Sequence, residues 1–227
     1  INGLQVANSG TVEKAAVCVD VSLKSIEEAV GHGADMLFVH HGLFWGKGEL
    51  LSGGMYERVK RLITNDIALY AAHLPLDLHA QYGNNAQVAK VFSWPVTGDF
   101  GDYHGVVIGK ELTFSPPLPL AVLVKQMEEK LNCRTDVWDF GPTEIGKAAY
   151  VSGGGVSMLQ EAIEMNYDCF ITGEAAHSSY WPAREAGINV VFAGHYATET
   201  LGVKAVAVAL EKKYGLESVF IDLPTGY

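Results

Sequence analysis

The chain has 227 residues, of which 48% are hydrophobic and 19% charged, so it is an ordinary globular protein with ample material for a core. Its formal net charge of -10 weighs against non-specific binding to nucleic acid or anionic membranes, because no basic surface would offset phosphate repulsion. No apolar run approaches the roughly 18 residues of a membrane-spanning helix.

The cysteines indicate a reducing compartment. Cys18, Cys133 and Cys169 are odd in number, far apart and without a C-x-x-C spacing, which predicts buried thiols and a cytoplasmic location. No secretory leader is visible. Because the chain starts at Ile1, we expect that an N-terminal stretch is missing from it.

The first third of the chain alternates strands and helices. Residues 14–21 are predicted to form a buried strand, Ser25 to cap a helix over 26–32, and residues 36–39 to form a strand that ends at His40, His41 and Gly42. Such β-α-β alternation predicts parallel strands with helical crossovers. A glycine-rich loop over 43–54, a helix over 56–65 and a strand over 67–72 complete this part.

The rest of the chain contains a middle segment and a second α/β part. Asn85 is predicted to cap a helix over 86–92. Strands over 106–108 and 112–114 are predicted beside a proline-rich run over 115–119. Residues 153–155 are three glycines without phosphate-loop spacing, which predicts a tight turn. The other predicted elements are helices over 120–131, 158–165 and 199–214 and strands over 149–152, 169–172, 188–193 and 219–222.

The second part repeats the first. An offset of 133 residues places Ala34–Val39 on Tyr167–Thr172, and an offset of 122 places Ala68–His73 on Val190–His195. Similar hydrophobic patterns are common, but polar residues that recur at matching strand ends favour a duplication. We therefore predict an α/β fold of two intertwined repeats with mixed, largely parallel sheets: a first repeat over 1–100, a middle segment over 101–148 without an inserted domain, and a second repeat over 149–227.

Histidines and carboxylates gather at the predicted strand ends, where open α/β sheets bind their ligands. Imidazole nitrogens and carboxylate oxygens suit Zn, Mn, Fe or Co, and two such ions can activate water or clamp a phosphoryl oxygen. We predict two divalent ions in the cleft between the repeats, one held by His40 and His195 and the other by His41 and Asp77. Glu199, four residues after His195 and on the same helix face, is predicted to bridge them. Each residue alone has an ordinary structural explanation, but their conjunction favours a metal centre.

Three further residues lie near this set. Glu174 is the candidate catalytic group as a general base, although its position also suits a hydrogen bond to a ligand, a substrate contact or a helix-start carboxylate. His177 is predicted to support the ligands. His73 is predicted to orient Asp77 rather than to bind metal, because Pro75 should break helical geometry between them.

Several motifs resemble one known family, the Nif-three-like family (NGG-one-interacting factor three), whose members are also called GTP cyclohydrolase I type 2 homologues. The resemblance spans nearly the whole chain and implies a dinuclear metal site with the five ligands above and a toroidal homo-hexamer. The segments that carry it are Ile1–Val6, Val39–Trp45, Ala72–Asp77, Gly83–Asn85, Ile171–Glu174 and Gly194–Glu199.

The function predicted from these features is metal-dependent hydrolysis of a nucleotide or another small phosphorylated or cyclic compound, as in a GTP cyclohydrolase. The alternative is a non-catalytic metal-binding scaffold or metal carrier that forms a ring and binds a partner. Turnover of a small molecule would support the first hypothesis, and metal-dependent partner binding without turnover would support the second.

Overall fold

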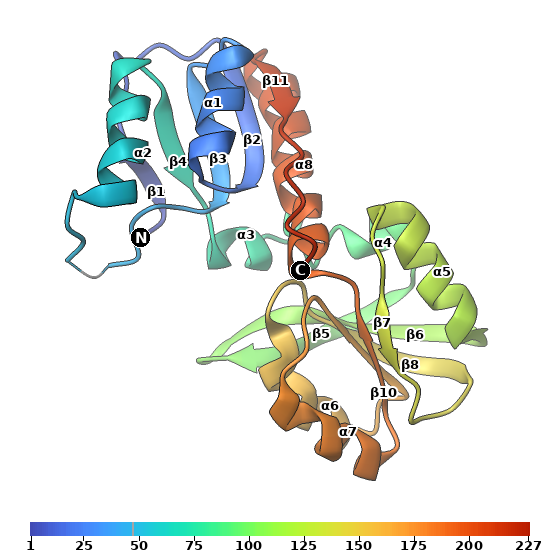
Figure 1. Ribbon diagram of the computed structural model, residues 1–227. Helices are drawn as coiled ribbons and strands as arrows, with labels where there is room; N and C mark the ends of the chain where they lie inside the picture. The colour runs from blue at the N-terminus through green and yellow to red at the C-terminus, as the bar shows by residue number, and fades with distance from the viewer. Residues whose placement is uncertain (47) are drawn as a thin grey trace. The chain divides into compact units, whose positions relative to one another are not determined.

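The structure is a computed structural model that describes residues 1–46 and 48–227 (Figure 1). The chain divides into two compact units: unit 1 comprises Ile1–Leu76 and Gly202–Leu223, and unit 2 comprises Asp77–Leu201 and Pro224–Tyr227. Each unit has its own mixed β-sheet, so the predicted α/β class is confirmed. The predicted loop over 43–54 includes residue 47, which lies outside the described residues.

Unit 1 contains a five-stranded sheet in the order β1-β4-β3-β2-β11, in which β1 alone runs antiparallel to its neighbour. Strands β2 and β3 are buried along most of their length, as expected for parallel strands covered on both faces. The elements of unit 1 are β1 (Gly3–Val6), β2 (Lys14–Asp20), α1 (Leu23–Gly31), β3 (Met36–His41), α2 (Gly53–Thr64), β4 (Ala68–Ala71) and β11 (Glu217–Phe220).

Unit 2 contains a six-stranded sheet in the order β5-β6-β8-β9-β10-β7, with β8, β9 and β10 parallel to one another. Two helices, α3 (Leu74–Leu78) and α8 (His195–Tyr214), have residues in both units. The remaining elements are α4 (Val88–Phe92), β5 (Val96–Tyr103), β6 (Val106–Pro119), α5 (Leu120–Leu131), β7 (Asp136–Trp138), β8 (Glu144–Tyr150), η1 (Gly155–Met158), α6 (Leu159–Glu164), β9 (Cys169–Thr172), η2 (His177–Ser179), α7 (Tyr180–Ala186) and β10 (Asn189–Phe192).

The two units share a local motif. Unit 1 runs β2-α1-β3-α2-β4 and unit 2 runs β8-α6-β9-α7-β10, with the three strands parallel in each. Asp35, just before β3, accepts two backbone N–H groups at the start of β2 on its Oδ2, at 2.9 and 3.0 Å. Asp168, just before β9, accepts the N–H groups of Gly146 and Lys147 within β8 on its Oδ2, at 2.9 and 2.8 Å. These aspartates occupy equivalent places in the two motifs.

The register corrects one alignment within the repeat. The first residue of β3 faces the first residue of β4, and β9 and β10 are paired in the same way. Ala68, which faces the start of β3, is therefore equivalent to Asn189, which faces the start of β9. Strands β4 and β10 thus correspond at an offset of 121 residues rather than 122. The predicted match of His73 with His195 is therefore wrong by one residue.

Two predicted helix caps are also wrong. Ser22 is the N-cap of α1, and its backbone N–H donates to Ser25 Oγ at 2.8 Å while Ser25 N–H donates to Ser22 Oγ at 3.0 Å, which is a capping box. Asn85 does not cap α4, whose N-cap position is Gln87. Asn85 is buried, and its Oδ1 accepts the Ser152 backbone N–H at 2.8 Å.

Prolines interrupt the chain less than the sequence suggested. Pro75 lies in the first turn of α3, where a missing backbone N–H costs nothing, so the predicted break in helical geometry does not occur. Strand β6 continues through Pro116 and Pro117. Its pairing with β8 is irregular between Thr113 and Leu118, so the prolines lie where the regular ladder does not require a backbone N–H. Among the described residues, none of the helices combines the length and hydropathy that a bilayer crossing requires.

Candidate metal centre

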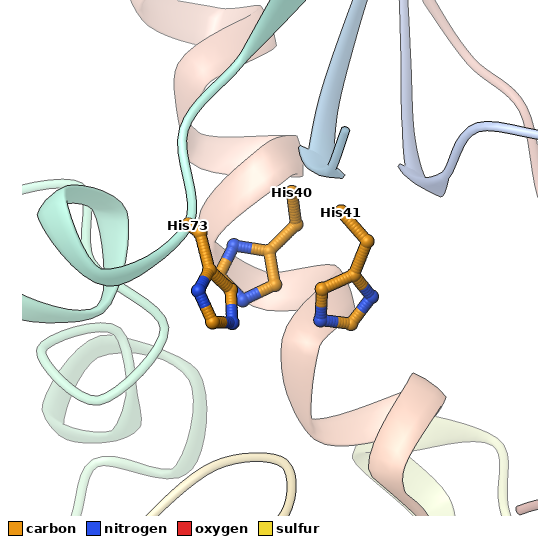
Figure 2. A group of neighbouring side chains, drawn as sticks. All are labelled: His40, His41 and His73. Atoms are coloured by element: carbon orange, nitrogen blue, oxygen red, sulfur yellow. The ribbon is translucent and has the colours of Figure 1, made fainter. Parts of the chain in front are cut away.

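Three histidines of unit 1 gather where β3 and β4 end (Figure 2). His40 and His41 are the last two residues of β3, and His73 follows β4. Their ring centroids lie 4.7 to 5.4 Å apart, and one nitrogen from each ring falls within 4.8 Å of the others. These three residues could therefore hold a metal ion.

Hydrogen bonds assign the ring nitrogens of two of these histidines. The Nδ1 of buried His40 lies 2.9 Å from the Ala72 carbonyl oxygen, and a carbonyl oxygen only accepts, so Nδ1 donates. The Nδ1 of His41 donates to Asp20 Oδ1 at 2.8 Å. In the neutral ring, Nε2 then carries the lone pair that a metal requires.

Unit 2 presents a second set of groups around His195, the first residue of α8. Its Nδ1 lies 3.1 Å from Glu174 Oε2, and its Nε2 lies 3.2 Å from Glu199 Oε1 one helical turn later. The hydrogen bond with Glu199 raises the pKa of His195 to about 9 against the opposing effect of burial, with smaller contributions from Glu174. Two carboxylates therefore concentrate negative charge around one imidazole.

The turn after β8 packs against this pair. A Cβ added to Gly153 would lie 2.1 Å from Glu199 Oε1 and 3.2 Å from His195 Nε2, and Gly153 also has a φ of +64°. A Cβ on Gly154 would lie 3.2 Å from Glu174 Oε1. The tight turn predicted over 153–155 is a bend at Gly153 and Gly154 only, because Gly155 already begins η1. The backbone of this bend packs against the carboxylates of Glu199 and Glu174.

Asp77 is held by buried polar side chains of unit 2. Its Oδ1 accepts the Asn84 amide at 2.9 Å and the Ser152 hydroxyl at 3.4 Å. Burial and, to a smaller extent, the negative charges of Glu199 and Asp77 raise the pKa of the buried Tyr150 hydroxyl.

The donors of both sets fit a borderline divalent ion, since imidazole nitrogen and carboxylate oxygen are its preferred ligands. His73 joins its two neighbours as a potential ligand, because the helical geometry at Pro75 removes the argument against it. His177 lies in η2, and its predicted supporting role stays a prediction.

Sequence reasoning missed the partners of the ligands. Asp20 is paired with His41 across β2 and β3, so the ends of neighbouring parallel strands carried a usable signal. Asn84 lies in the Gly83–Asn85 segment of the family resemblance, but neither it nor Ser152 could be assigned to Asp77 from the sequence, because their bonds depend on how two loops fold within unit 2.

Comparisons with known proteins agree with one another. A family model described as Duf34/NIF3 (NGG1p interacting factor 3) matches residues 1–225. A Pyrococcus horikoshii protein named GTP cyclohydrolase 1 type 2 homolog is 44% identical, over 99% of this chain and 90% of its own. Two solved structures are 37% identical: a protein called ybgI, of unknown function (TM-score 0.92, covering 100% and 91%), and one from Thermus thermophilus (TM-score 0.91, covering 100% and 90%).

Proposed function

Because this chain belongs to the Duf34/NIF3 family, we propose that it is a dinuclear metal protein that hydrolyses a nucleotide or another small phosphorylated or cyclic compound. The cyclohydrolase name of its relatives points to this substrate class. The proposed metal ligands, drawn from both units, are His40, His41, Asp77, His195 and Glu199.

The observation that carries the proposal is the orientation of the imidazoles in unit 1. His40 and His41 use Nδ1 to donate to Ala72 O and Asp20, respectively, which leaves Nε2 as the metal-binding atom in both. A histidine that only fills a core needs no carboxylate bonded to its Nδ1, and His41 has such a partner in Asp20. Hydrogen bonds of this kind on the far ring nitrogen are the usual companions of metal-ligating histidines.

The other proposed ligands include two carboxylates of unit 2, Asp77 and Glu199. Bound divalent ions would supply Lewis-acid activation of water and of the substrate oxygen. Glu199 is buried and packed against Gly153, which fixes its carboxylate, while Asn84 fixes Asp77. Glu174 contacts His195 through Oε2 but is half exposed, so we propose that it also accepts a proton as general base.

Elemental analysis combined with a nucleotide panel tests this function. We expect about two divalent ions per chain and product release from at least one nucleotide, with both lost in His41→Ala and Glu199→Gln. The matched controls are His32→Ala and Glu57→Gln, which change exposed residues of unit 1 at the end of α1 and within α2. Stoichiometric metal without turnover on a broad panel would contradict the hydrolase proposal and favour a scaffold or carrier.

The family resemblance also leads us to propose a ring of six copies. Native mass spectrometry should give six times the chain mass of 24.5 kDa. A single species at one chain mass across micromolar concentrations would contradict this assembly.

A further inference from the structure

A small pocket of unit 1 lies beside the three histidines. It encloses about 180 Å³, and its lining includes Asn2, Gln5, His40, Phe44, Trp45 and His73. No Asp, Glu, Lys or Arg side chain is among its described lining residues. Among the described lining residues, the pocket therefore has two imidazoles but no charged side chain that would recognise a phosphate.

The loop that carries Trp45 is clamped in place. Gln5 Oε1 accepts the Leu43 backbone N–H at 2.7 Å, and Gln5 Nε2 donates to the Phe44 carbonyl oxygen at 3.1 Å. A Cβ added to Gly42 would lie 2.6 Å from Ala71 Cβ, so the loop leaves β3 in close contact with β4. These contacts hold the backbone just before Trp45 against β1 and β4.

Trp45 presents its indole next to the imidazoles. The ring lies edge-on to His73, with centroids 4.9 Å apart and planes at 79°, and 6.1 Å from the ring of His41. The side chain is 49% exposed. An exposed indole is apolar surface left in water, and its face is the natural stacking surface for a flat ring.

We infer that this pocket is the subsite for a planar heteroaromatic ring of the substrate, stacked on Trp45. Pockets for whole drug-sized ligands enclose at least about 300 Å³, so a space of about 180 Å³ suits one ring system rather than a nucleotide. The inference rests on the proposed function, because His40, which lines the pocket, is one of its proposed metal ligands. Trp45 thereby sets specificity for aromatic over purely sugar-phosphate compounds.

Calorimetric binding of four nucleosides and one free heteroaromatic ring tests this subsite without turnover. The probes are guanosine, adenosine, cytidine, uridine and nicotinamide, with ribose 5-phosphate as the non-aromatic comparison, on protein whose metal content is measured separately. We expect at least one ring probe to bind, and Trp45→Ala to weaken it about 5- to 150-fold, the effect of losing one base–aromatic stack. Trp45→Phe should weaken ring binding by less than Trp45→Ala does. Neither substitution should change the binding of ribose 5-phosphate.

Trp181→Ala is the matched control, since Trp181 is 59% exposed on α7 of unit 2. Absence of binding by every ring probe, or equal binding by wild type and Trp45→Ala, would overturn the subsite. Loss of metal from the Trp45→Ala protein would also overturn the subsite, because it would show that the indole holds the metal ligands in position. A protein that binds rings but holds no metal would refute the proposed function and leave the subsite standing.

Discussion

At the residue scale, two of the candidate ligands have a carboxylate beside their ring nitrogen Nδ1. His41 is backed by Asp20 at 2.8 Å and His195 by Glu174 at 3.1 Å, so each unit contains a carboxylate–histidine pair. A carboxylate fixes the tautomer and raises the basicity of the opposite ring nitrogen, which strengthens metal binding. Substituting one of these acids therefore tests its effect on metal binding while the histidine ligands stay in place.

Asp20→Asn should weaken metal binding about 10- to 100-fold, because the amide keeps the hydrogen bond to His41 but removes the charge. Competition with a chelating dye of known affinity measures the change. Glu57→Gln removes one exposed negative charge from α2 and serves as control. Equal affinities for the two variants would refute a role for Asp20.

The pH dependence of the chelated protein follows from His195. Its folded-state pKa of about 9 lies above the ordinary value of 6.5, so the charged ring stabilises the fold fully below pH 6.5. This stabilisation should disappear as the pH rises from about 6.5 to 9. NMR titration of the ring protons should give the raised pKa, and Glu199→Gln should bring it towards 6.5. A wild-type pKa at or below 6.5 would contradict the structure.

At the element scale, the most informative feature is the turn between β8 and η1. Gly153→Ala should lower stability by about 1–2 kcal/mol through its positive φ, and should also weaken metal binding by displacing Glu199. Gly187→Ala is the control, because its φ of +67° is similar but the nearest atom to the added Cβ is Phe140 O at 3.6 Å. Denaturation and metal titration of both variants separate the effects. Wild-type metal affinity in Gly153→Ala would refute the contact.

The β-α-β pattern of unit 1 could be predicted from the sequence, because buried strands and crossover helices have distinct hydrophobic periods. In unit 2 the helix α7 was not predicted, and β8 begins at Glu144, before the predicted strand over 149–152. The same pattern of strand ends selected His40, His41 and Glu174, and the structure places the two histidines at the end of β3 and Glu174 just after β9. Sequence reasoning failed where an element depends on tertiary contacts: Asn85 is buried against Ser152 rather than at a helix start. Strands β1, β5 and β7 were not predicted, since each pairs antiparallel at an edge of its sheet and carries little apolar pattern of its own.

At the scale of the whole molecule, metal binding and folding are linked. Bound metal adds RT ln(1 + [L]/Kd) to the native state, about 2.7 kcal/mol when free metal is roughly 100 times Kd. Chelation should therefore lower the melting temperature, and returned metal should restore it. A variant combining His41→Ala with Glu199→Gln should melt at the same temperature with and without chelator. An unchanged wild-type melt after verified metal removal would contradict the linkage.

The most direct test of the metal centre is an anomalous-difference map from crystals of the metal-loaded protein. We predict two peaks per chain, coordinated by Nε2 of His40, His41 and His195 and by carboxylate oxygens of Asp77 and Glu199. Peaks bound elsewhere, or ordered crystals of metal-loaded protein without a peak at these residues, would contradict it.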